Sequence, residues 1–123
     1  MEKSELCTSH VQKILKELTM YHTGWANDIR EGWGVEMKGS REILFSLYEI
    51  SGSIILSLQD VLLGRFHDKT VLRLVQQKLE KLITSEDFKE FDILGQTHAC
   101  NVITNGTKHH IRVMLETLEV LTA

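Results

Sequence analysis

The stretch "ILFSLYEISGSIILSLQDVLL", residues 43–63, decides the fold of this chain. Large apolar side chains occur on every side of it if it is helical, whereas a surface helix with one buried stripe needs only about three or four per two turns. Ser40 can cap the start of such a helix, and Gly64 can end it in the left-handed conformation that glycine adopts at little cost. A helix of this composition must be covered on more than one side. It therefore lies at the centre of the domain, or its outer face meets another chain.

The flanking segments also have helical periodicity. Apolar residues spaced by three and four predict a first helix from Ser4 to Glu31, and the same spacing predicts a third helix that starts at Asp68 or Thr70. The chain has no proline, so no segment is barred from a helix interior. The first seam consists of Val11, Ile14, Leu18, Tyr21 and Trp25, and the second of Leu72, Val75, Leu79 and Leu82.

The segment "NVITNGTKHH", residues 101–110, allows three interpretations. Asn105-Gly106 among β-branched residues is a strong hairpin signal. The helical spacing that follows, however, leaves no room for a second strand, and an isolated hairpin is only marginally stable. We therefore expect two helices, 96–104 and 108–121, broken at Asn105-Gly106 with Thr107 as the second cap. A continuous, locally strained helix is the alternative.

Length and composition indicate a single all-α domain, residues 1–123, built as a compact bundle of four to five helices around the apolar second helix. Two distant cysteines, Cys7 and Cys100, do not form a disulfide framework. The polar N-terminal residues lack the apolar run of a secretory signal, so we expect a reducing, cytoplasmic setting. Glu49 and Asp60 inside the most apolar stretch argue against a membrane span.

The sequence offers weak candidates for a catalytic or metal site. None of the six histidines has the i, i+4 spacing that places two imidazoles on one helical face. No glycine-rich phosphate loop or nucleophile motif is present, so we expect no cofactor and favour a non-enzymatic protein over an enzyme. The alternative is a metal- or thiol-dependent enzyme whose site is assembled from different helices by His22, His98, Cys100 and His110.

A second alternative is a weak nucleic-acid binder. Cations recur on one face of the third helix, but no aromatic side chains lie between them for base stacking, and the net charge of the chain is −3. A solvated polar face opposite an apolar seam is the more ordinary reading, so nucleic acid is the less favoured partner. The cations are Arg65, Lys69, Arg73 and Lys81.

The function most consistent with these features is a non-enzymatic interaction module, such as an adaptor, inhibitor or accessory subunit, that presents a helical surface. The excess of large side chains on the second helix predicts a homodimer, because monomers seldom expose a contiguous apolar patch. Trp33, between two glycines, either folds onto the core or anchors a partner. The predicted partner-binding residues are Phe45, Ile55, Leu56 and Leu63, with Trp33 at the rim.

Overall fold

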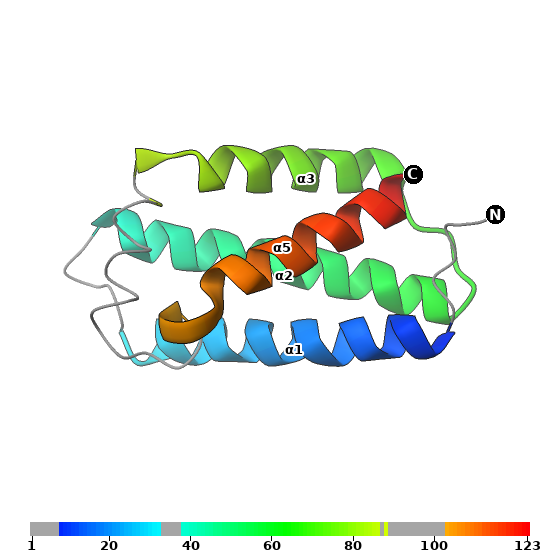
Figure 1. Cartoon of the computed structure of the whole chain (residues 1–123), viewed down its shortest axis with the longest axis horizontal. Helices are drawn as coiled ribbons and strands as arrows, with labels where there is room; N and C mark the ends of the chain where they lie inside the picture. Colours follow the sequence, from blue (N-terminus) through cyan, green and yellow to red (C-terminus); the bar gives the residue numbers. More distant parts are fainter. Residues whose placement is uncertain (1–7, 33–37, 87, 89–102) are drawn as a thin grey trace.

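The computed structural model describes residues 8–32, 38–86, 88 and 103–123. This part of the chain is all-helical, and none of its residues forms a strand. The prediction of a compact helical bundle is confirmed. Its four helices are α1 (Thr8–Arg30), α2 (Lys38–Leu62), α3 (Lys69–Ile83) and α5 (Ile103–Thr122) (Figure 1).

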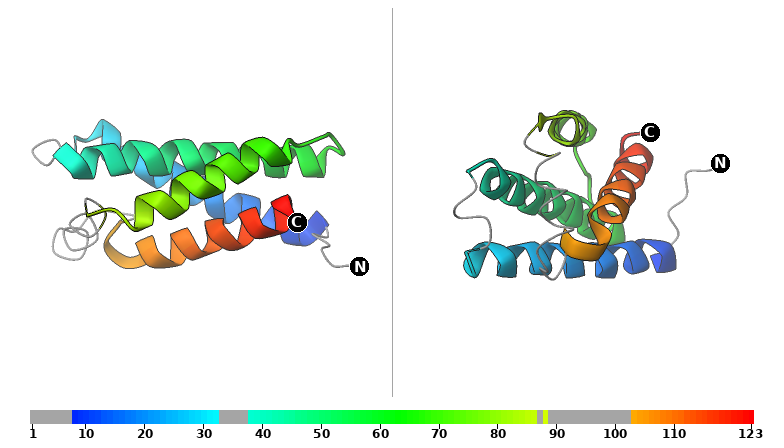
Figure 2. Two further views of the ribbon diagram at one scale, coloured as in Figure 1. Left: turned by 90° about the horizontal axis from the view of Figure 1, so that it is seen from above. Right: turned by 60° about the vertical axis from the view of Figure 1, so that its left-hand side comes forward.

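The apolar helix α2 is central, as predicted. It contacts all three of the other helices, and α1 and α3 lie on opposite sides of it while α5 crosses in front (Figure 1). Helix α3 begins close to the end of α2 and then runs away from it over α5 (Figure 2). One side of the α2–α3 pair is therefore covered by α5, and the other side has no helix over it among the described residues.

Helices α1 and α2 pack closely around the core. Leu18 and Trp25 of α1 and Leu47, Ile54 and Leu58 of α2 have no exposed surface. Packing is tight at one crossing point: a Cβ added at Gly52 would lie 3.2 Å from Cε1 of His22, so that the imidazole would have to shift by a few tenths of an ångström.

The turn between α2 and α3 is defined by its caps. Gly64 has φ of 70°. The N–H of Arg65 donates to the carbonyl of Asp60 (2.7 Å) and that of Gly64 to Val61 (3.1 Å), a Schellman ending. Asp68 then caps α3, since its Oδ1 accepts hydrogen bonds from the N–H groups of Thr70 (2.9 Å) and Val71 (3.3 Å). The predicted end of the second helix is confirmed, and of the two predicted starts of the third helix Asp68 is the correct one. The predicted cap of the second helix is wrong, because α2 begins at Lys38 and Ser40 lies inside it.

The predicted helix break at Asn105-Gly106 is wrong. Helix α5 runs without interruption from Ile103 to Thr122, so Thr107 is not a cap and the continuous alternative is correct. Asn105 and Gly106 lie in the first turn, where backbone N–H groups have no intrahelical partner, so weak helix formers cost little there. The buried seam of Ile111, Met114, Leu118 and Leu121 holds the remainder of the helix on the core. Residues 96–102 of the other predicted helix lie outside the described residues.

Among the described helices, none combines the length and the apolar character that a membrane span requires.

Candidate functional site

The outer side of α2 carries a line of exposed apolar side chains. Phe45, Leu56 and Leu63 are separated by eleven and seven residues, close to whole numbers of helical turns, so they point in the same direction. Leu56 and Leu63 are 64% and 63% exposed, and Phe45 is 44% exposed. The guanidinium of Arg41 lies 5.2 Å from the centre of the Phe45 ring and covers part of it.

The other two predicted partner-binding residues have different positions. Ile55 is half-buried and packs against the core, so it is not part of the exposed line. Trp33 lies outside the described residues.

Helix α3 and the turn before it extend this line into a broader surface. Phe66, Val71 and Leu74 are 85%, 51% and 60% exposed. The Nζ of Lys78 lies 3.3 Å from Oε1 of Glu49, which marks one level shared by the antiparallel helices α2 and α3. Seven residues from that pair along each helix, Leu56 of α2 is level with Val71 of α3. We call the surface formed by Leu56, Leu63, Phe66, Val71 and Leu74 the α2–α3 apolar face, and Phe45 continues it along α2.

Sequence reasoning missed the α3 half of this face. Val71 and Leu74 lie off the seam of Leu72, Val75, Leu79 and Leu82, so they are surplus apolar residues in the same sense as those of α2. The surplus of apolar residues on α3 was the feature of the sequence that could have predicted this half of the face.

The histidines of the predicted metal site have separate surroundings. His22 stacks on Tyr48 with ring centres 4.2 Å apart, and its Nδ1 lies 2.8 Å from Oγ of Ser51. Because that hydroxyl donates to the carbonyl of Tyr48, it accepts from the Nδ1–H of His22. Burial lowers the pKa of His22.

His110 lies instead between α5 and α1, stacked on Tyr21 with ring centres 3.6 Å apart. His98 and Cys100 lie outside the described residues, and within the described residues no three His, Cys, Asp or Glu side chains are placed to hold a metal ion.

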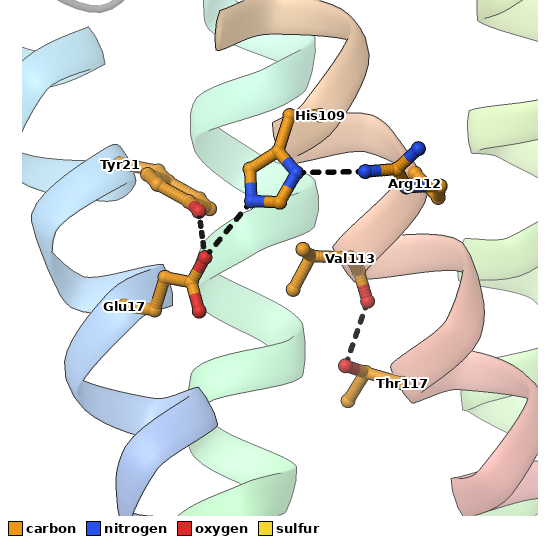
Figure 3. A network of polar contacts seen from close by, with 6 residues as sticks. All are labelled: Glu17, Tyr21, His109, Arg112, Val113 and Thr117. Carbon is orange, nitrogen blue, oxygen red and sulfur yellow. Dashed lines mark hydrogen bonds and ion pairs between the residues drawn. The ribbon is translucent and has the colours of Figure 1, made fainter.

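A polar network crosses from α1 to α5 (Figure 3). Glu17 accepts hydrogen bonds from the hydroxyl of Tyr21 and from Nε2 of His109, the latter at 3.2 Å. Arg112 donates to Nδ1 of His109 at 3.0 Å, which leaves the proton of a neutral imidazole on Nε2. The hydrogen bond from Tyr21 lowers the pKa of Glu17, and burial raises the pKa of Tyr21. The network therefore keeps Glu17 ionised as an acceptor.

A groove lies beside this network, between α1 and α5. Its volume of about 220 Å³ is below the roughly 300–1,000 Å³ of sites for drug-sized ligands. Ile14, Val113 and Val120 supply its apolar surface, and the polar residues around it have both signs of charge. The polar lining residues are His10, Lys13, Glu17, Glu116 and Thr117.

Among the described residues, three buried side chains carry a polar atom for which no other described residue is a hydrogen-bond partner: Trp25 Nε1, Asp28 Oδ2 and His110 Nδ1. Asp28 is 2% exposed; burial, with the nearby charge of Glu31, raises its pKa to about 6. Burial, with the nearby charge of His109, lowers the pKa of His110 to about 4. Both groups are thus displaced toward their neutral forms.

The cations of the third helix are divided between two roles. Nζ of Lys69 donates to the carbonyl of Ala123 (2.7 Å) and Arg73 to that of Thr122 (3.1 Å), so these two side chains satisfy carbonyls at the C-terminal end of α5. His67 Nε2 lies 3.3 Å from the carbonyl of Leu121 and contributes to the same cap. Arg65 and Lys81 are exposed. A continuous row of four cations free to meet phosphates is therefore not present on α3.

In comparisons with known proteins, no family model, no curated protein and no solved structure matches this chain.

Proposed function

We propose that this protein is a non-enzymatic interaction module that binds protein through the α2–α3 apolar face, and that a second copy of the chain is its first partner. The observation that carries the proposal is the exposure of Leu56, Leu63, Phe66, Val71 and Leu74, between 51 and 85%, on two adjoining elements. Scattered exposed leucines are ordinary on a monomer, but the largest contiguous apolar patch of a surface is often a functional one.

The area of the face supports association. With about 150 Å² for a fully exposed large apolar side chain, the low end of the range for aromatic ones, the five residues expose roughly 500 Å². A standard interface buries about 800 Å² on each partner, of which close to 60% is apolar, which is again roughly 500 Å². The face thus has the apolar area that one partner contributes to a stable dimer.

Burial of this apolar surface on both copies favours association. The groove between α1 and α5 offers much less apolar area to a partner.

The test is the molar mass of the purified protein in solution, measured by light scattering over a range of concentrations. We expect the wild type to approach twice the chain mass of 14.1 kDa as concentration rises. Leu56→Glu places a charge in the face and is expected to return the mass to that of the single chain.

Met20→Glu is the matched control. Met20 is 64% exposed, as Leu56 is, but lies on α1, on the other side of α2 from α3 (Figure 1). This variant is expected to associate like the wild type. A wild-type mass of 14.1 kDa at every concentration would contradict the proposal, as would equal loss of association in both variants.

A further inference from the structure

We infer that the second copy binds in one particular orientation, in which a two-fold axis runs lengthwise along the α2–α3 apolar face, so that α2 of each copy packs on α3 of the other. This inference rests on the proposed function and adds the arrangement of the two copies. It is drawn from the charges that border the α2–α3 apolar face and from the register of the two helices.

The charges on the two sides of the face have opposite signs. On α2, Glu42 and Glu49 are exposed and Asp60 is half-buried. On α3, Lys78 and Lys81 are exposed. Apart from Arg41, which lies over Phe45, the charges on this side of α2 are therefore acidic and those on this side of α3 basic, and charged and apolar residues alternate along each helix.

This polarity distinguishes the two ways in which the face can pack on itself. A two-fold axis perpendicular to the helices places α2 on α2 and α3 on α3, so that carboxylates meet carboxylates and lysines meet lysines. A lengthwise axis exchanges the two elements, so that the acidic helix of each copy meets the basic helix of the other. Juxtaposed like charges disfavour the first arrangement, and opposite charges favour the second.

The register of α2 and α3 makes the second arrangement self-complementary in its apolar contacts as well. Rotation about the lengthwise axis leaves each residue at its own level along that axis. The pair Glu49–Lys78 marks one level, and Leu56 and Val71 share the level seven residues away. Leu56 of one copy then meets Val71 of the second copy, and Glu49 of one copy meets Lys78 of the other. The Glu49 carboxylate of each copy already lies next to Lys78 of its own chain and gains the Lys78 ammonium of the other copy as a second neighbour.

Cross-linking between two differently mutated chains tests this arrangement. Leu56→Cys and Val71→Cys are made separately in the full chain with Cys7 and Cys100 replaced by alanine, and one variant carries a tag so that each pairing has its own mass. The two variants are mixed, allowed to exchange and treated with a short bismaleimide. We expect the mixed pair, Leu56→Cys with Val71→Cys, to cross-link at least tenfold more than either variant alone. Met20→Cys in place of either variant is expected to give no cross-link.

The molar mass of the same samples separates the two proposals. If they are dimers and Leu56→Cys cross-links mainly to itself, or no pair cross-links, the lengthwise axis is wrong while association stands. If they have the mass of a single chain and no cross-link forms, both the orientation and the proposed function are wrong.

Discussion

At the scale of single residues, two ionisable side chains in the core respond to pH in opposite directions. The pKa of Asp28 is raised to about 6, so the folded state holds its proton where the unfolded chain has lost it. The pKa of His110 is lowered to about 4, so between about pH 4 and 6.5 His110 is neutral in the folded state and protonated in the unfolded chain. Stability contributed by Asp28 falls as pH rises from about 4 to 6, and stability contributed by His110 rises over about 4 to 6.5. The pH dependences of stability that Asp28 and His110 contribute therefore have opposite signs and offset each other.

Asp28→Asn tests the first slope. The substitution removes the charge and keeps the shape, so the destabilisation that ionised Asp28 brings above pH 6 disappears. A pKa change of about two units corresponds to about 3 kcal/mol. The free energy of unfolding of the variant, relative to wild type, is expected to increase by about 2–3 kcal/mol between pH 4 and pH 7. Urea unfolding at both pH values measures it, and an unchanged difference would contradict the raised pKa of Asp28 in the folded state.

His110→Phe tests the opposite slope. Phenylalanine retains an aromatic ring against Tyr21, whose ring centre lies 3.6 Å from that of His110, but it cannot take up a proton. Relative to wild type, its free energy of unfolding is expected to increase by about 3 kcal/mol as the pH falls from 7 to 4. The double variant with Asp28→Asn serves as control, because it lacks both slopes. A single variant that follows the wild-type pH profile would show that the pKa of His110 is the same in the folded and unfolded states, and would contradict its lowering by burial.

At the scale of helices, the sequence was most informative where a local signal and the apolar seam agreed. Asp68 and Gly64 lie at the boundaries of apolar repeats, and both act as predicted. At Asn105-Gly106 the local signal disagreed with the repeat that follows it, and the repeat prevailed because tertiary packing outweighs the preference of a single turn. The residues at helix boundaries can therefore be predicted where the local capping signal and the apolar repeat agree.

The backbone at the end of α2 provides a third prediction. Gly64 has φ of 70°, and a Cβ there would have no atom within 4 Å, so the cost of a side chain is purely conformational. Gly64→Ala is expected to lower the free energy of unfolding by about 1–2 kcal/mol. Gly64→Asn is the control and is expected to cost less, because asparagine tolerates the left-handed region. Equal losses in the two variants, measured by urea unfolding, would contradict this explanation.

The candidate binding surface was only partly predictable from sequence. Phe45, Leu56 and Leu63 could be selected because α2 has more apolar residues than one stripe needs, but periodicity alone could not tell that Ile55 would pack inward. Val71 and Leu74 become part of a surface only through the register of α3 on α2, which depends on the turn and on the packing of the buried Leu72 and Leu79. Contacts between helices are not encoded in the spacing within either one.

At the scale of the whole molecule, α2 serves two purposes on opposite sides. Leu58 on its inner side has no exposed surface and packs in the core, whereas Leu56, two residues away, is 64% exposed in the α2–α3 apolar face. Folding of the chain depends on the first side, and association depends on the second if the proposed function is correct. The same substitution at the two positions should therefore have different consequences.

Leu58→Ala and Leu56→Ala separate folding from association. Leu58→Ala leaves a cavity and is expected to lower the free energy of unfolding by about 2–5 kcal/mol at every protein concentration. For a dimer that unfolds as it dissociates, a tenfold rise in concentration adds about 0.7 kcal/mol per chain, or about 2–4 °C in the unfolding midpoint. Wild type and Leu58→Ala are expected to show this dependence and Leu56→Ala to lose most of it. If Leu56→Ala instead lowered the midpoint equally at all concentrations, Leu56 would stabilise the single chain, and the α2–α3 apolar face would not be where two copies meet.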